Sequence, residues 1–353
     1  MLDRLPAELI LELAALVAPR RESHVAWLAW RSRILRLCLV CRYLRSVLEP
    51  VVWETVWAGE IELARIAQCA RVSSETACPH ETCACVARQD GAGWHRVKRL
   101  RLDGRFQEGL VVGPADIEVY SQLESLEVDN CRLSLTASLS PIHHLTSLWL
   151  DTINITHVQW EVLTSDHVTP NLRYLSVRRL HSGAVGFTQA ETAFYFPHFA
   201  PDLVQRLGVL QVDLTDRPLF PPDLFTLECP VVLTWRCWHA APSSLAAVSR
   251  HPRHLVIGHV YGNPAQSKQW FVNSEQRLVE WVKYRSPGAR TLILPAGLSP
   301  YNRANDPYVR LGIQHLLAEC AKNRVLVEWH HQENWQEEYR LHRVLEERRF
   351  ASA

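Results

Sequence analysis

The sequence predicts an α/β protein in which a small helical domain precedes an irregular solenoid that builds a parallel sheet with outer helices or loops. Apolar residues recur at helical spacing near the start of the chain. A leucine-rich pattern then returns along the middle of the chain at steps of roughly 20 to 30 residues, and later at about 35 residues, as in irregular stacked repeats. Hydrophobic residues make up 47% of the 353 residues, enough to bury a sizeable core.

The charge balance and the apolar runs exclude several classes of protein. The chain carries 38 basic and 37 acidic residues, so bulk positive charge does not predict nucleic-acid binding. No apolar run approaches the roughly 20 residues of a membrane span. Asp3 and Glu8 do not fit the basic start of a signal peptide. We therefore expect a cytoplasmic or nuclear protein, without a membrane partner, whose ten cysteines are mostly thiols.

Two helices are expected before residue 50. The first covers 5–17, where Pro6 suits the first turn and one stripe is apolar, at positions 5, 9, 10, 13, 16 and 17. Pro19 ends it. The second is expected over 25–47, with solvated arginines, until Pro50 breaks the chain and Trp53 and Trp57 follow.

Three separated motifs carry a family resemblance. They read LPAEL at 5–9, LRLCLVCRYLR at 35–45 and PVVW at 50–53. In this order they resemble the F-box, over about residues 3 to 57. The stretch 19–33, which holds Trp27 and Trp30, is longer than the usual link between the first two helices of that family. The alternative is an ordinary helical hairpin that begins a core.

The resemblance implies docking to a small Skp-type adaptor of a cullin–RING ubiquitin ligase. Carried over position by position, it implies these adaptor-binding residues: Leu5, Pro6, Leu9, Ile10, Leu37, Val40, Cys41, Arg42, Tyr43, Pro50 and Trp53. The chain would then be a substrate-recognition subunit of an SCF-type ligase.

The repeat pattern is L-x-x-L-x-L with conservative swaps. It is centred on Leu100, Leu126, Leu148, Leu175 and Leu210, with weaker echoes near Leu255, Leu292 and Leu326. This spacing is typical of leucine-rich repeats, with outer segments such as 115–121, 157–163 and 274–285. We expect an F-box-like domain at 1–57, a linker with a cysteine-rich loop at 58–96, and repeats at 97–350 that end in a capping helix at 334–350. The alternative is a single α/β domain with a parallel sheet.

Strand alternation predicts a substrate-binding face. Residues between the inward-facing leucines would be exposed, including Asp103, Asp129 and Asp151 as an acidic column, with Trp149 and Tyr174 as aromatic anchors. The full predicted set adds Arg101, Glu127 and Arg178. We hypothesise that this face binds a protein with a basic element. Alternatively, each aspartate hydrogen-bonds the turn after its strand.

One cluster of cysteines and a histidine lies in the expected linker at 58–96. Residues 78–85 read CPHETCAC, and Cys78, His80, Cys83 and Cys85 are a weak alternative zinc set. Since paired C-x-x-C ligands are missing, we interpret them as an incidental loop and expect no metal or other cofactor.

No phosphate loop, nucleophile elbow or H-E-x-x-H motif occurs, so we expect no enzyme. The rival functional hypothesis is a leucine-rich-repeat scaffold, unrelated to ubiquitin, whose N-terminal helices cap the repeats.

Overall fold

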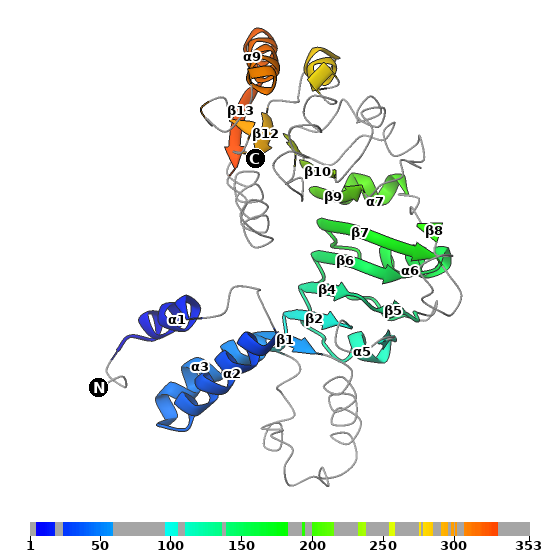
Figure 1. Cartoon of the computed structure of the whole chain (residues 1–353). Coiled ribbons are helices and arrows are strands. Elements are labelled where there is room, and N and C mark those ends of the chain that lie inside the picture. Colours follow the sequence, from blue (N-terminus) through cyan, green and yellow to red (C-terminus); the bar gives the residue numbers. More distant parts are fainter. Residues whose placement is uncertain are drawn as a thin grey trace. The chain divides into compact units, whose positions relative to one another are not determined.

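The computed structural model consists of two compact units, Met1–Asn171 and Leu172–Ala353 (Figure 1). It describes residues 5–17, 24–58, 96–104, 110–135, 139–182, 193–194, 200–214, 232–237, 254–257, 275–276, 278–284, 291–295, 298–299, 301 and 307–330. Helices and parallel strands occur in both units, as expected of an α/β protein. No helix in these ranges is long and apolar enough to cross a lipid bilayer.

The first unit begins with three helices, α1 (Ala7–Leu16), α2 (His24–Cys38) and α3 (Arg42–Glu54). The prediction of one helix over 25–47 was wrong, because the chain breaks between α2 and α3. Cys41 is extended there, with φ −157°, and its Sγ accepts a hydrogen bond from the backbone N–H of Leu44 at 3.4 Å. The predicted break at Pro50 was also wrong, since Pro50 lies inside α3.

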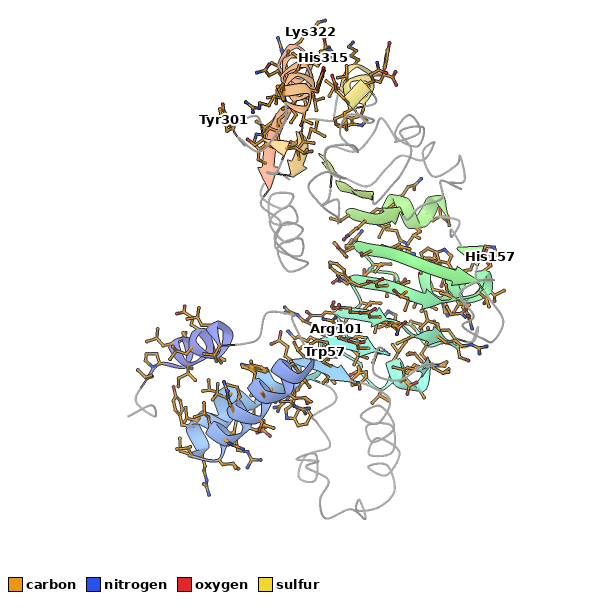
Figure 2. All side chains as sticks on the ribbon, in the orientation of Figure 1. Trp57, Arg101, His157, Tyr301, His315 and Lys322 are labelled. Atoms are coloured by element: carbon orange, nitrogen blue, oxygen red, sulfur yellow. The ribbon has the colours of Figure 1, made fainter. Side chains whose placement is uncertain are left out.

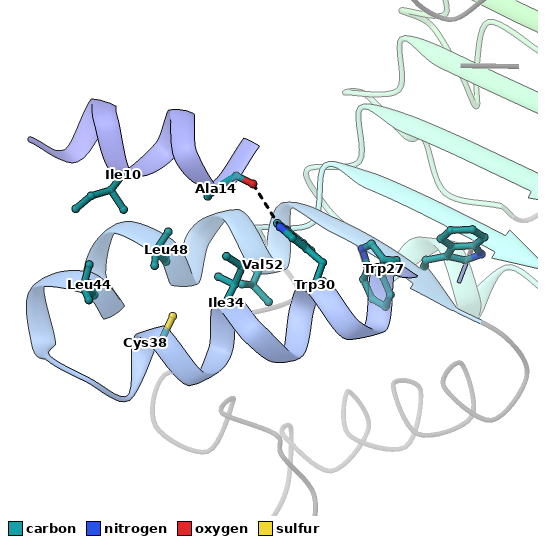
Figure 3. Packing of buried hydrophobic residues seen from close by; sticks show 10 residues of the cluster. Ile10, Ala14, Trp27, Trp30, Ile34, Cys38, Leu44, Leu48 and Val52 are labelled. Atoms are coloured by element: carbon teal, nitrogen blue, oxygen red, sulfur yellow. Dashed lines mark hydrogen bonds between the residues drawn. The ribbon is translucent and has the colours of Figure 1, made fainter. Parts of the chain in front are cut away.

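The three helices enclose one apolar core, and we call residues 5–17 and 24–58 the helical module. Ile10 and Ala14 of α1 point toward α2 and α3, and the Trp30 indole Nε1 donates to the carbonyl of Ala14 at 3.3 Å (Figure 3). Trp27 and Trp30 are both buried. The stretch that exceeds the usual inter-helix link therefore includes the first half of α2, and its tryptophans face the core.

A parallel sheet follows directly. Strand β1 (Thr55–Ala58) begins where α3 ends and pairs with β2 (Arg99–Asp103). Next in order are β4 (Ser125–Asp129) and β6 (Ser147–Asn154), so the strand order follows the chain. The short strands β3 (Val111–Val112) and β5 (Arg132–Leu133) also pair in parallel, and β5 pairs in turn with the end of β6.

The predicted alignment of the leucines on adjacent parallel strands of the first unit is confirmed. Leu100 pairs with Leu126 and Leu126 with Leu148, all three almost fully buried. Two of the expected outer segments contain helices, α5 (Ala115–Glu118) and α6 (His157–Thr164). A capping box begins α6, where Thr156 and Gln159 exchange side chain to backbone hydrogen bonds.

The second unit repeats the arrangement, with six parallel strands among its described residues. Their order again follows the chain: β7 (Tyr174–Ser182), β9 (Val209–Leu214), β10 (Val232–Cys237), β11 (His254–Ile257), β12 (Thr291–Pro295) and β13 (Leu326–His330). Strand β8 (Ala193–Phe194) pairs antiparallel with β7, and α7 is Pro201–Arg206.

The second unit confirms two further expectations. The weaker echoes near Leu255, Leu292 and Leu326 are all strands. Residues 278–284 are helical and bury the predicted face of Leu278, Trp281 and Val282. A longer helix, α9 (Pro307–Lys322), precedes β13. The predicted capping helix at 334–350 lies outside the described residues.

Candidate docking surface and sheet face

Helix α1 has two apolar faces, of which only one is used inside the module. Ile10 and Ala14 are 5% and 3% exposed and belong to the core. Leu9, Leu13 and Leu16 are spaced as positions i, i+4 and i+7, and they are 46%, 49% and 81% exposed. A helix with a leucine row left in solvent is typical of a helix that contacts another protein.

A second exposed apolar group lies at the turn between α2 and α3. Leu39 and Val40 are 83% and 70% exposed, and Leu37 and Tyr43 are also exposed. The turn itself is held by backbone hydrogen bonds, from the N–H of Leu39 to Arg36 and from the N–H of Val40 to Leu37, each 3.1 Å. The apolar side chains therefore project from an ordered turn.

One hydrogen bond joins these two groups. The Tyr43 hydroxyl donates to the backbone carbonyl of Leu5 at 2.8 Å, so the start of α1 lies against the start of α3. We call the half-buried Leu5 before α1 and the exposed apolar residues of α1 and of this turn the docking face: Leu5, Leu9, Leu13, Leu16, Leu37, Leu39, Val40 and Tyr43.

The predicted adaptor-binding residues divide between this face and the core. Ile10 and Trp53 are buried, 5% and 9% exposed, and their side chains pack within the module. Contact of these two residues with a partner stays a prediction. Cys41 is half-buried at the N-cap of α3, whereas Pro6, Arg42 and Pro50 are exposed.

The module is also tied together by stacked cations. The Arg31 guanidinium lies 5.1 Å from the ring centroid of Trp27 and 4.6 Å from that of Trp53, so it links α2 to α3. Arg31 is one of the arginines of 25–47 that were expected to be solvated, and these ring contacts correct that expectation.

On the sheet of the first unit, four residues on adjacent strands form one row, and three of them belong to the predicted substrate-binding set. Trp57, Arg101, Glu127 and Trp149 are register partners across β1, β2, β4 and β6. The Arg101 guanidinium lies 4.1 Å from the centroid of the Trp57 ring (Figure 2). Its Nε is 3.3 Å from Glu127 Oε1, and its Nη2 is 3.9 Å from Asp129 Oδ2.

The predicted acidic column has the expected strand register, but its carboxylates are buried or contact other side chains. Asp103, Asp129 and Asp151 pair across the sheet. Asp103 is only 2% exposed, Asp129 faces Arg101, and Asp151 accepts a hydrogen bond from the Thr152 hydroxyl at 2.9 Å. The expectation of a bare acidic column is corrected, because an arginine of the same face offsets part of its charge.

The aromatic anchors are buried, which corrects a second expectation. Trp149 is 7% exposed, and its indole Nε1 donates to the Ser147 hydroxyl at 3.2 Å. Tyr174 is 3% exposed, and its hydroxyl donates to Gln211 Oε1 at 2.8 Å. For Arg178 the structure gives only the backbone pairing with Asp213 on β9.

No candidate metal site is present among the described residues. The cysteine-rich residues Cys78, His80, Cys83 and Cys85 lie outside them. No protein-family model matches the chain, and no curated protein sequence is significantly similar to it.

Proposed function

We propose that the chain is the substrate-recognition subunit of an SCF-type ubiquitin ligase. In this proposal the docking face binds a Skp-type adaptor, and the repeat sheet carries a separate surface for a protein substrate. The chain makes no bond itself and acts by raising the local concentration of the substrate near the ubiquitin-charged enzyme.

The observation that carries the proposal is the unused apolar face of α1. Leu9, Leu13 and Leu16 remain exposed although the same helix already buries Ile10 and Ala14. Complete burial of each leucine side chain is worth about 1.5–3 kcal/mol, so a partner that covers this row gains several kcal/mol. The exposed Leu39 and Val40 lie in the segment that resembles the second F-box motif.

The rival scaffold hypothesis makes a different demand on α1. A cap would cover its apolar stripe with the first repeat strands. The buried side of α1 packs on α3, and the core it joins is built from the helical module. The exposed row therefore favours docking to another protein over capping.

Cys131 supports a leucine-rich-repeat fold for the sheet independently of the spacing of the leucines. The repeat consensus continues L-x-x-L-x-L-x-x-N/C-x-L. Leu123, Leu126, Val128, Cys131 and Leu133 fit all five positions, and all are nearly fully buried. The Cys131 Sγ lies 3.0 Å from the carbonyl oxygen of Asp129 and 3.9 Å from that of Leu102. The Cys131 thiol thus contacts backbone carbonyls of two adjacent strands, β2 and β4.

The direct test is binding of the full chain to a purified Skp-type adaptor. The double substitution Leu9→Asp with Leu13→Asp places two charges on the exposed row without altering Ile10 or Ala14. We expect it to abolish adaptor binding in a pull-down while the thermal midpoint of unfolding changes by no more than a few degrees.

The matched control uses the apolar residues that are exposed elsewhere. Tyr308→Asp with Leu311→Asp changes two side chains of α9 that are 81% and 65% exposed. Adaptor binding should survive this change. If the unaltered chain does not bind the adaptor, the proposal fails. It fails equally if both double variants bind as well as the unaltered chain.

A further inference from the structure

Three arginines at the edge of the docking face lack the partners that their neighbours have. Among the described residues, Arg33, Arg36 and Arg42 make no ion pair and no ring contact, and all three are exposed. By contrast, Arg45 pairs with Glu49 at 3.2 Å and Arg31 stacks between two tryptophans. We call Arg33, Arg36 and Arg42 the arginine trio.

The trio surrounds the exposed turn in sequence. Arg36 precedes Leu37, Arg33 lies one helical turn earlier on α2, and Arg42 opens α3 directly after Cys41. From His24 to Ala58 the chain contains five arginines, two glutamates and no lysine or aspartate. This part of the module is therefore cationic, and one of its two glutamates is already paired.

Apolar side chains beside unpaired cations specify the chemistry of the partner. Covering Leu39 and Val40 with a purely apolar surface would remove water from nearby guanidinium groups without replacing its hydrogen bonds, which is costly. An acidic rim on the partner would avoid that cost and would steer the two proteins together.

We infer that the surface which covers the turn between α2 and α3 is an apolar groove edged by carboxylates. The arginine trio contacts those carboxylates. This inference rests on the proposed function, and it adds to it the charge of the partner and the residues that read it. The apolar row holds the complex, whereas the trio accelerates its formation.

The test is the association rate of the full chain with a purified Skp-type adaptor, measured at about 50 mM and about 500 mM NaCl, where screening differs strongly. The variant carries Arg33→Gln, Arg36→Gln and Arg42→Gln together. We expect its association rate to be roughly tenfold lower at low salt and close to that of the unaltered chain at high salt. The dissociation rate should change less than the association rate.

Two single substitutions serve as controls. Arg45→Gln removes an arginine of α3 that is already paired with Glu49, and Arg132→Gln removes an exposed arginine of β5 outside the module. Both should retain the salt dependence of the unaltered chain. The thermal midpoint of each variant shows whether the module is still folded.

The outcomes separate this inference from the proposed function. If the triple variant associates as fast as the unaltered chain at low salt, the inference is overturned while adaptor docking stands. A loss of equal size at both salt concentrations overturns it as well. If the unaltered chain does not bind the adaptor, the proposed function fails and this inference fails with it.

Discussion

The Tyr43 hydroxyl donates a hydrogen bond to the backbone carbonyl of Leu5, with 2.8 Å between the two oxygens. These residues are 38 positions apart in the sequence, at the starts of α3 and α1. The bond fixes the beginning of α1 beside the exposed turn that contains Leu39 and Val40. Together with the buried contacts of Ile10 and Ala14, it holds the two apolar groups beside each other.

Removing this hydroxyl should loosen the docking face without emptying the core. Tyr43→Phe keeps the ring and loses the hydrogen bond, which at an exposed site contributes about 1 kcal/mol or less. We expect the thermal midpoint of the whole chain to change little. The amide hydrogens of residues 10–14, the first of α1 that are bonded within the helix, should exchange faster, and adaptor affinity should fall several-fold.

Tyr284→Phe is the matched control, since Tyr284 is exposed in the second unit and outside the module. Equal exchange rates in Tyr43→Phe and the unaltered chain would show that the hydrogen bond does not hold α1 in place.

Arg101 and Glu127 should be energetically coupled on the sheet. Their side chains are 14% and 18% exposed, and 3.3 Å separates the paired atoms. A double-mutant cycle with Arg101→Gln and Glu127→Gln should give a coupling of about 1 kcal/mol in the free energy of unfolding.

A second ion pair of the same length offers the comparison. Lys98 and Glu124 are also 3.3 Å apart but 46% and 48% exposed. Solvent screening should reduce their coupling to below about 0.5 kcal/mol. Equal coupling in the two pairs would mean that burial of the Arg101 pair contributes nothing.

A methyl group at Gly104 should destabilise the first unit. An ideal Cβ there would lie 2.1 Å from the backbone oxygen of Asn130, which cannot move without disturbing β4. Gly104→Ala should lower the free energy of unfolding by about 1–3 kcal/mol, the usual range for overpacking. Gly113→Ala is the control, because its Cβ would meet only Asp116 Oδ2, at 3.7 Å. Similar unfolding curves for both variants would contradict this.

Alkaline pH should weaken the fold in part through Cys131. Burial raises the pKa of the Cys131 thiol to about 12. The unfolded thiol ionises near its ordinary pKa of 9.0, so it releases its proton first as the pH rises. The free energy of unfolding should therefore be unaffected by this group below that value and should fall between about pH 9 and pH 12.

Burial also raises the pKa of Cys38 and of Tyr120, and both act in the same direction. Cys131→Ala removes one of the three groups, so urea unfolding at pH 8 and pH 10.5 should show a smaller loss for this variant than for the unaltered chain. The same loss in both would show that the thiol does not contribute.

The strand register could be predicted from the sequence because side chains on a strand alternate strictly. The pairing of Leu126 with Leu100 on one side and with Leu148 on the other follows from that rule. Alternation does not reveal which side chains cover the face of the sheet opposite the leucines. Trp149, Tyr174 and Asp103 were expected to be exposed and are buried, and Arg101 offsets acids that were assumed to be free.

The helix boundaries failed where tertiary packing overrides local preference. No glycine or proline marks the break at 39–41, and cysteine is not among the preferred N-cap residues. Pro50 remains inside α3 although an interior proline costs about 3 kcal/mol. Leu48, Val52 and Trp53 on either side of it are buried, and their burial offsets that cost.

The central claim is that the exposed face of α1 and the turn between α2 and α3 bind a Skp-type adaptor together. Amide hydrogen exchange of the full chain, with and without a saturating amount of purified adaptor, tests it most directly. We expect added protection at residues 7–16 and 37–43 and unchanged exchange in β9 and α9. Protection confined to the strands of the sheet, or none anywhere in the helical module, would contradict adaptor docking.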